Sequence, residues 1–95
     1  MAHLTDEEIH DYCSVNTDWQ FTGKQLVREA TAESFLAGIG WVNQVAQIAE
    51  TLDHHPDIDI RWRTVRFMLA THSEGGVTER DLELAEHINR VLAAK

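Results

Sequence analysis

Residues 57–71 read DIDIRWRTVRFMLAT, and apolar side chains alternate with polar ones along most of this run. Alternation with a period of two is typical of β-strands that bury one face. The pattern breaks near Arg63 and Thr64, so we expect two strands joined by a turn at that point. His72 follows in phase with Met68, which would place this histidine at the end of the second strand.

A second pair of strands is expected earlier in the chain, between Asp18 and Ala30. Trp19 and Phe21 alternate with polar residues, and Gly23 lies where a turn is needed. The return strand would run over residues 25–30. The chain therefore contributes two hairpins to its predicted sheet.

Two helix starts carry the same signal, a threonine followed three residues later by an acid. Thr5 and Glu8 form one such pair, and Thr78 and Asp81 form the other. In a capping box the threonine side chain and the acid each accept a hydrogen bond from the other residue's backbone N–H group. We expect helices to begin at both places, the first of them fading near residues 14–16.

The strongest helical pattern runs from Thr31 to Leu52, where apolar residues recur every three or four positions. They cover nearly half of the helix circumference, which is more than one sheet face usually buries. Either this is a central core helix, or part of the apolar arc meets another subunit. Gly38 and Gly40 could mark close packing. Pro56 disfavours helical geometry in the residue before it, so the helix should end earlier.

The elements follow in the order helix, two strands, helix, two strands, helix. Hairpins with helices between them favour an antiparallel sheet covered by helices on one face. We therefore predict a two-layer α+β fold, with a four-stranded antiparallel sheet and three helices. The length of 95 residues predicts one domain over residues 1–95.

The composition excludes several classes of partner. The chain has 8 basic and 16 acidic residues and a net charge of −8, whereas binding to nucleic acid or to an anionic membrane needs clustered Lys and Arg.

The single Cys13 excludes an internal disulfide, and it reads as a small core residue rather than a reactive thiol. No apolar run reaches the ~20 residues that span a bilayer. The first eight residues do not resemble a signal peptide, so we expect a cytoplasmic protein.

Three histidines lie where predicted elements end: His54 and His55 after the long helix, and His72 after a strand. They allow three interpretations. A zinc site needs three or four converging ligands. A structural role needs only solvation or capping of carbonyl groups. General acid–base catalysis suits a side chain with an unperturbed pKa of about 6.5, provided that a neighbour orients each ring. The candidate orienting carboxylates are Glu50, Asp53 and Asp81.

Two motifs make the sequence similar to a known family. Residues 50–56 read ETLDHHP and residues 71–81 read THSEGGVTERD, with the aromatic Trp62 between them. This pattern resembles the signature of the pterin-4a-carbinolamine dehydratases, and the order of elements extends the resemblance over nearly the whole chain. The resemblance implies removal of water from 4a-hydroxytetrahydropterin, which regenerates the pterin cofactor of aromatic amino acid hydroxylases. It implies no metal and no organic cofactor.

The resemblance also implies roles for individual residues. His54, His55 and His72 would surround the pterin ring, with His54 and His72 as the acid–base pair and His55 positioning the ring. Supporting or substrate-binding residues would be Glu50, Asp53, Trp62, Thr71, Arg80 and Asp81. For Arg80 and Asp81 the alternative is a plain role in helix capping.

The chain departs from the family pattern at two aromatic positions. Ile58 and Trp62 stand where family members usually carry Trp and Tyr, so one aromatic edge is lost near the site. The family forms dimers or tetramers, in keeping with the broad apolar arc of the long helix. The partners implied are a pterin, further copies of this chain and an aromatic amino acid hydroxylase. Some relatives instead bind other proteins, a role that needs an exposed helix but not the three histidines.

Overall fold

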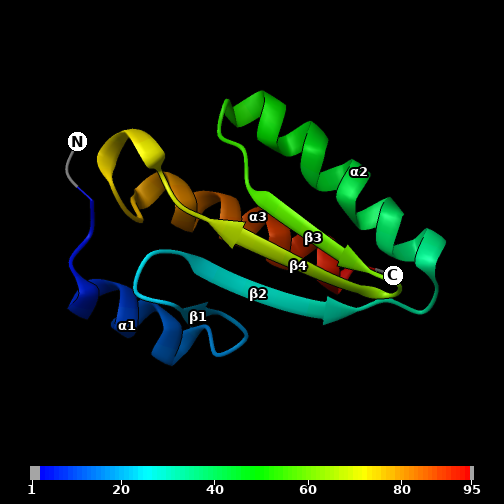
Figure 1. Cartoon of the computed structure of the whole chain (residues 1–95), viewed down its shortest axis with the longest axis horizontal. Coiled ribbons are helices and arrows are strands. Elements are labelled where there is room, and N and C mark those ends of the chain that lie inside the picture. The colour runs from blue at the N-terminus through cyan, green and yellow to red at the C-terminus, as the bar shows by residue number, and fades with distance from the viewer. Residues whose placement is uncertain (1–2, 95) are drawn as a thin grey trace.

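The computed structural model describes residues 3–94, and its elements follow the predicted order (Figure 1). The helices are α1 (Asp6–Val15), α2 (Phe35–Leu52) and α3 (Glu79–Ala93). The strands are β1 (Gln20–Phe21), β2 (Leu26–Thr31), β3 (Asp57–Arg61) and β4 (Thr64–Leu69). A short 3-10 helix, η1 (His72–Glu74), follows β4.

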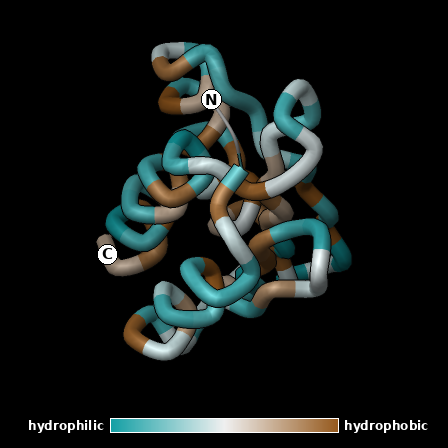
Figure 2. Tube along the Cα trace, turned by 90° about the vertical axis from the view of Figure 1, so that its left-hand side faces the viewer, coloured by the Kyte–Doolittle hydropathy of each residue, from teal (hydrophilic) through white to brown (hydrophobic). Residues whose placement is uncertain are grey.

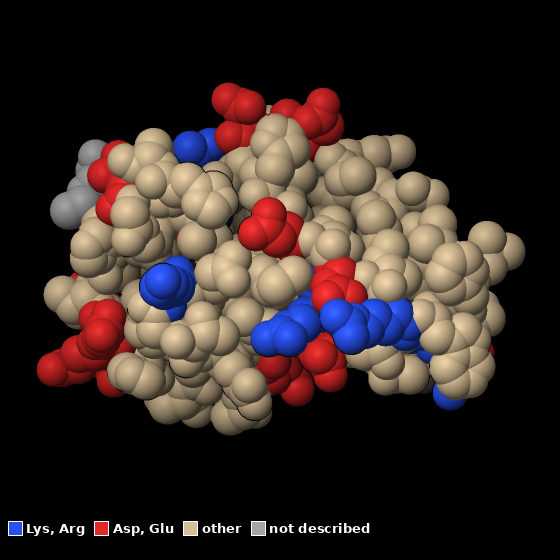
Figure 3. Space-filling model, viewed as in Figure 1, with Lys and Arg blue, Asp and Glu red and all other residues tan. Residues whose placement is uncertain are grey.

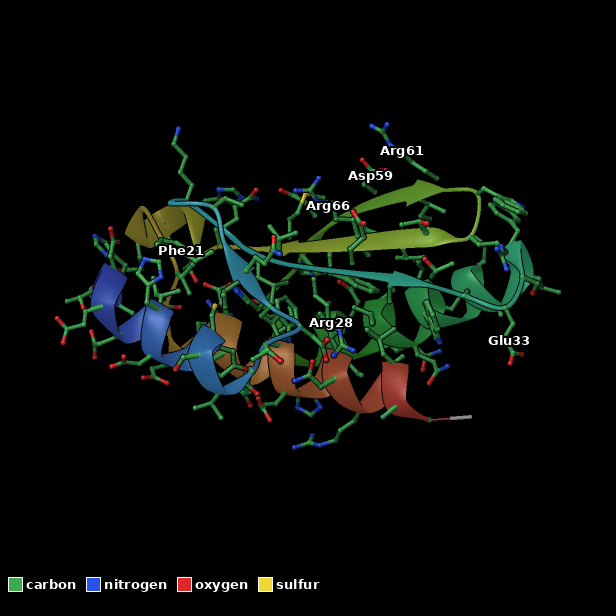
Figure 4. The ribbon with its side chains drawn as sticks, turned by 90° about the horizontal axis from the view of Figure 1, so that it is seen from below. Phe21, Arg28, Glu33, Asp59, Arg61 and Arg66 are labelled. Atoms are coloured by element: carbon green, nitrogen blue, oxygen red, sulfur yellow. The ribbon has the colours of Figure 1, made fainter. Side chains whose placement is uncertain are left out.

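The four strands form one antiparallel sheet in the order β1-β2-β4-β3. Each predicted hairpin is present, and the pairing of β2 with β4 joins them. All three helices lie on one face of the sheet (Figure 4). The predicted two-layer α+β fold is confirmed.

The register decides which segments meet at each end of the sheet. Leu26 pairs with Leu69, and Asp57 pairs with Met68. The start of β2, the end of β4 and the start of β3 therefore share one end. Residues 54–56 lead into β3 and η1 follows β4, so both reach this same place, which we call the histidine end of the sheet.

The core lies between the sheet and the helices. Its completely buried apolar side chains are Leu26, Val45, Val65, Phe67, Leu84, Ala85 and Ile88. In β4 they alternate with the exposed Arg66, as the period of two predicted. Figure 2 shows hydrophobic residues recurring along the helices between hydrophilic ones, which is what an amphipathic helix requires.

Helix α2 begins later than predicted. Thr31 is the last residue of β2 and pairs with Thr64, so the helix starts only at Phe35, with Ser34 as its N-cap. A Cβ atom on Gly38 would lie 3.2 Å from the Val65 side chain, which confirms close packing at that glycine. Gly40 has nothing within 4 Å, so the same interpretation is wrong there.

The prediction that His72 ends a strand is also wrong. Strand β4 ends at Leu69, and the chain then folds back because the Thr71 N–H group donates to the Gly76 carbonyl at 2.8 Å. His72 consequently opens η1. This tight turn still leaves His72 at the histidine end of the sheet.

Two surfaces of the fold are open to solvent. On the sheet face away from the helices, Asp59, Arg61 and Arg66 project outward, and arginine side chains gather over β3 and β4 (Figures 3 and 4). At the start of α2, Phe35 and Leu36 are 51% and 78% exposed, so this chain alone does not cover the apolar arc. None of the helices in residues 3–94 is long and apolar enough to cross a membrane.

Cys13 lies half-buried in α1 against the core. Burial raises the pKa of its thiol. A raised pKa keeps the thiol in its unreactive protonated form at neutral pH. Its environment therefore agrees with the interpretation of Cys13 as a packing residue.

Candidate active site

His54 is turned inward by the end of helix α2. Asp53 is the C-cap of α2 and has a left-handed backbone, with φ of 51°. The next residue, His54, is 8% exposed, and its Nε2 lies 2.5 Å from Oδ1 of Asp81. Two residues that are 27 positions apart therefore form a buried histidine–carboxylate pair.

The Asp81 carboxylate is fully buried, and both of its oxygens have partners. Oδ2 accepts hydrogen bonds from the Thr71 hydroxyl at 2.8 Å and from the Thr78 N–H group at 2.9 Å. The Thr71 and Thr78 hydroxyl oxygens are 2.7 Å apart. A buried carboxylate is tolerated only when such partners replace water. We call His54, Thr71, Thr78 and Asp81 the buried His54 cluster.

His55 follows directly but lies in a different environment. Its Nε2 pairs with Oε2 of Glu50 across the last turn of α2. The two side chains are 54% and 76% exposed. The structure thus brings Glu50, one of the three candidate orienting carboxylates, to His55 rather than to His54.

His72 lines a cavity of about 400 Å³, which lies within the size range of small-molecule sites. The residues around this cavity are Lys24, Gln25, Ala70, His72, Gly75 and Gly76. The Gln25 side chain donates to Asp57 at 3.2 Å, which links the cavity wall to the start of β3. His54 and His55 do not line the cavity, although all three histidines lie at the histidine end of the sheet.

Arg80 connects α3 to the end of α2. Its guanidinium group donates to the carbonyl oxygens of Leu52, at 3.3 Å, and Asp53, at 2.5 Å. A cation at a helix C-terminus is favoured by the helix dipole. Arg80 therefore stabilises the turn that places His54, and the backbone of Asp53 takes part in that contact.

Trp62 lies away from the other candidate residues. It occupies the turn between β3 and β4, with φ of 54° and 71% exposure, and the Arg63 guanidinium carbon lies 4.4 Å from its ring centre. Strand β3 separates it from His55 by roughly 20 Å at ~3.4 Å per residue. Within one chain, Trp62 is not brought to the histidines.

Sequence reasoning missed three residues here. Thr78 was expected only as a helix cap, yet its hydroxyl also lies beside that of Thr71. Lys24 was expected only in a hairpin turn and Gln25 only in the return strand, because a local pattern does not reveal which other segments meet at that end of the sheet. The signal that could have revealed the wider role of Thr78 is that two threonines, Thr71 and Thr78, lie on either side of a tight turn.

The described part of the chain shows no group of three His, Cys, Asp or Glu side chains that could hold a metal ion. Each helix-end histidine is instead paired with one carboxylate. A carboxylate that binds one ring nitrogen fixes the ring orientation and the tautomer, and leaves the other nitrogen to exchange a proton. The arrangement therefore suits proton transfer.

Comparison with known proteins identifies close relatives. A family model described as pterin 4 alpha carbinolamine dehydratase matches residues 2–91. A protein of Mycobacteroides abscessus with the provisional name pterin-4-alpha-carbinolamine dehydratase is 53% identical over 89 residues, covering 94% of this chain and 95% of that protein. A protein of Nocardia farcinica with the same provisional name is 50% identical over 88 residues, or 93% of each chain.

Two solved structures share the fold. A transcriptional coactivator/pterin dehydratase from Brucella melitensis matches with a TM-score of 0.87 and 35% identity, over 94% of this chain and 97% of that one. A pterin dehydratase-like protein, identified as a RuBisCO assembly factor in the alpha-carboxysome, matches with a TM-score of 0.65 and 17% identity, over 81% and 89% of the two chains. The second likeness concerns the fold alone.

Proposed function

The chain belongs to the pterin 4 alpha carbinolamine dehydratase family, and we propose that it removes water from 4a-hydroxytetrahydropterin to give quinonoid dihydropterin. The observation that carries the proposal is the buried pair of His54 and Asp81. A member of the family could lack this pair. Proton transfer by His54, however, requires that its ring be held in one orientation, and the pair with Asp81 provides this.

The reaction needs two proton transfers and no change in redox state. The C4a hydroxyl group leaves as water once it is protonated, and the loss of the N5 proton completes a C4a–N5 double bond. A general acid and a general base each contribute about 10²–10⁴-fold to such a step. In our proposal His54 and His72 are the acid–base pair, and His55, held by Glu50, positions the pterin ring.

The remaining candidate residues support this site. Asp81 and Thr71 hold His54, while Arg80 fixes the turn at Asp53. Trp62 could reach a pterin only from another copy of the chain. Assembly into a homodimer or homotetramer, a cytoplasmic location and a link to an aromatic amino acid hydroxylase belong to the same proposal.

The direct test generates the carbinolamine with a hydroxylase and follows dihydropterin absorbance. We expect the protein to accelerate dehydration. We expect His72→Ala to lose most of this activity while its circular dichroism stays unchanged. His87→Ala, on the side of α3, is the matched control and should keep full activity. No acceleration above spontaneous dehydration by the wild-type protein would refute the proposal.

A second candidate function is binding to another protein. It is favoured by the exposed Phe35 and Leu36 at the start of α2, and by the RuBisCO assembly factor that shares the fold. This role needs an exposed helical face and none of the histidines. A folded protein that is inactive as a dehydratase, and that keeps its partner after His54→Ala, would favour the binding role.

A further inference from the structure

One carboxylate joins the two segments that carry the proposed acid–base histidines. Oδ1 of Asp81 binds the His54 ring, and Oδ2 binds the hydroxyl group of Thr71. Thr71 directly precedes His72 in the chain. A shift of Asp81 would therefore disturb both His54 and the turn on which His72 sits.

The hydrogen-bond chemistry determines where the protons lie in this cluster. Oxygens of a carboxylate accept hydrogen bonds only. Nε2 of His54 therefore donates to Asp81, and in the neutral ring Nδ1 then carries no proton. The Thr71 hydroxyl donates to Asp81 as well, so the Thr78 hydroxyl is the donor to Thr71.

Nδ1 of His54 reaches the surface although the residue is nearly buried. It makes no hydrogen bond to the described residues. Among those residues, the buried side-chain nitrogen and oxygen atoms without a partner are Nε of Arg28 and Nε of Arg63. Since Nδ1 is not one of them, it keeps some access to solvent.

We propose that His54 exchanges its proton with substrate through Nδ1, and that Thr71 and Thr78 are positioning residues for it. The two hydroxyl groups form a relay, Thr78 to Thr71 to Asp81, which fixes the carboxylate plane and hence the His54 ring. The inference rests on the proposed dehydratase function, but it concerns which atom reacts and what holds it. If the hydroxyls only stabilised the fold, their removal would leave the hydrogen bond between His54 and Asp81 unchanged.

The first test reads the tautomer directly, by nitrogen-15 NMR of the histidine rings in the wild-type protein. We expect the neutral His54 ring to carry its proton on Nε2, with a downfield proton signal from the buried hydrogen bond to Asp81. We expect addition of a stable dihydropterin to shift the Nδ1 signal more than the Nε2 signal. A proton on Nδ1, or no response of Nδ1 to the pterin, would overturn the inference even if the protein is an active dehydratase.

The second test removes the relay. Thr71→Val should weaken the downfield signal and lower kcat by roughly tenfold or more with little change in KM, since small displacements of a catalytic group cost this much. Thr71→Ser should restore both. Thr31→Val is the control, because its hydroxyl lies 3.4 Å from that of Thr64 at the other end of the sheet.

The outcomes separate the two proposals. Loss of stability in Thr71→Val with unchanged kcat and an unchanged downfield signal would make Thr71 merely structural. A wild-type protein with the expected tautomer and Nδ1 response, but without dehydration, would refute the proposed function and leave the identity of the accessible nitrogen standing.

Discussion

Helices α1 and α3 begin with the same capping box, but the two boxes have different surroundings. In the first, the Thr5 N–H group donates to Glu8 at 2.9 Å and the Glu8 N–H group donates to Thr5 at 3.1 Å. In the second, Thr78 and Asp81 make the corresponding exchange. Glu8 is exposed to water, whereas Asp81 is fully buried.

Burial changes what the acid has to do. The free oxygen of Glu8 is solvated, so the box around it serves only to cap the helix. The second oxygen of Asp81 has no access to water and needs a partner from the protein. His54 donates to that second oxygen, and Thr71, from another segment, donates to the oxygen that also accepts the Thr78 N–H group. The same local motif is therefore a plain cap at α1 and part of a site at α3, depending on what packs over it.

The largest expected contrast is in activity, between Asp81→Asn and Glu8→Gln. An Asn amide can keep the cap at Thr78 but would donate to Nε2 of His54, which moves the ring proton to Nδ1. We expect the dehydration rate to fall by about 10²–10⁴-fold in Asp81→Asn. Glu8→Gln should retain the wild-type rate. Equal rates for the two variants would remove Asp81 from the mechanism.

The next contrast is in stability, between Thr78→Val and Thr5→Val. Loss of an N-cap costs about 1 kcal/mol, which is what we expect at Thr5. At Thr78 the buried hydroxyl partner of Thr71 is lost too, which adds about 1–3 kcal/mol. Urea unfolding monitored by circular dichroism measures both, with Thr78→Ser as the conservative control. Similar losses at the two positions would mean that the Thr78 hydroxyl contributes nothing beyond capping.

A smaller effect is expected for the exposed pair of His55 and Glu50. Because both side chains are largely in water, Glu50→Gln should change the free energy of unfolding by at most about 1 kcal/mol. Its effect on dehydration should appear mainly in KM, as expected for a residue that helps to position the substrate. A loss of kcat as large as that of Asp81→Asn would mean that the exposed pair matters as much for proton transfer as the buried pair.

The smallest effect is the pH dependence of the exposed capping box. Hydrogen bonds with Thr5 lower the pKa of the Glu8 carboxyl group below its ordinary value of 4.5, the bond with the Thr5 backbone more than the bond with its side chain. Because the pKa of Glu8 is lower in the folded state, ionised Glu8 stabilises the fold. This stabilisation is fully present above the unfolded-state pKa and is lost as pH falls through the folded-state pKa. The stability difference between wild type and Glu8→Gln should therefore shrink from neutral to acid pH. A difference that grows in acid would contradict this assignment.

Much of the fold was predictable because its signals are local. The period of two gave the strands, the period of three and four gave α2, and threonine–acid pairs marked two helix starts. The predicted ends of elements were wrong where pairing between distant residues overrode the local hydrophobic pattern. Thr31 remains in β2 because Thr64 pairs with it, and the turn closed by Thr71 and Gly76 removes His72 from the strand.

The sequence by itself determined the elements, their order and the family, because periodicity, caps and the His-His-Pro motif are readable in neighbouring residues. Only the tertiary structure decided that Asp81 meets His54, that Glu50 meets His55 and that Trp62 lies at the far end of β3. Glu50 and His55 are only five positions apart, but either histidine could have taken that carboxylate. His54 instead meets Asp81, 27 positions away, and that contact is set by how α2 and α3 pack on the sheet, because packing has no period in the sequence.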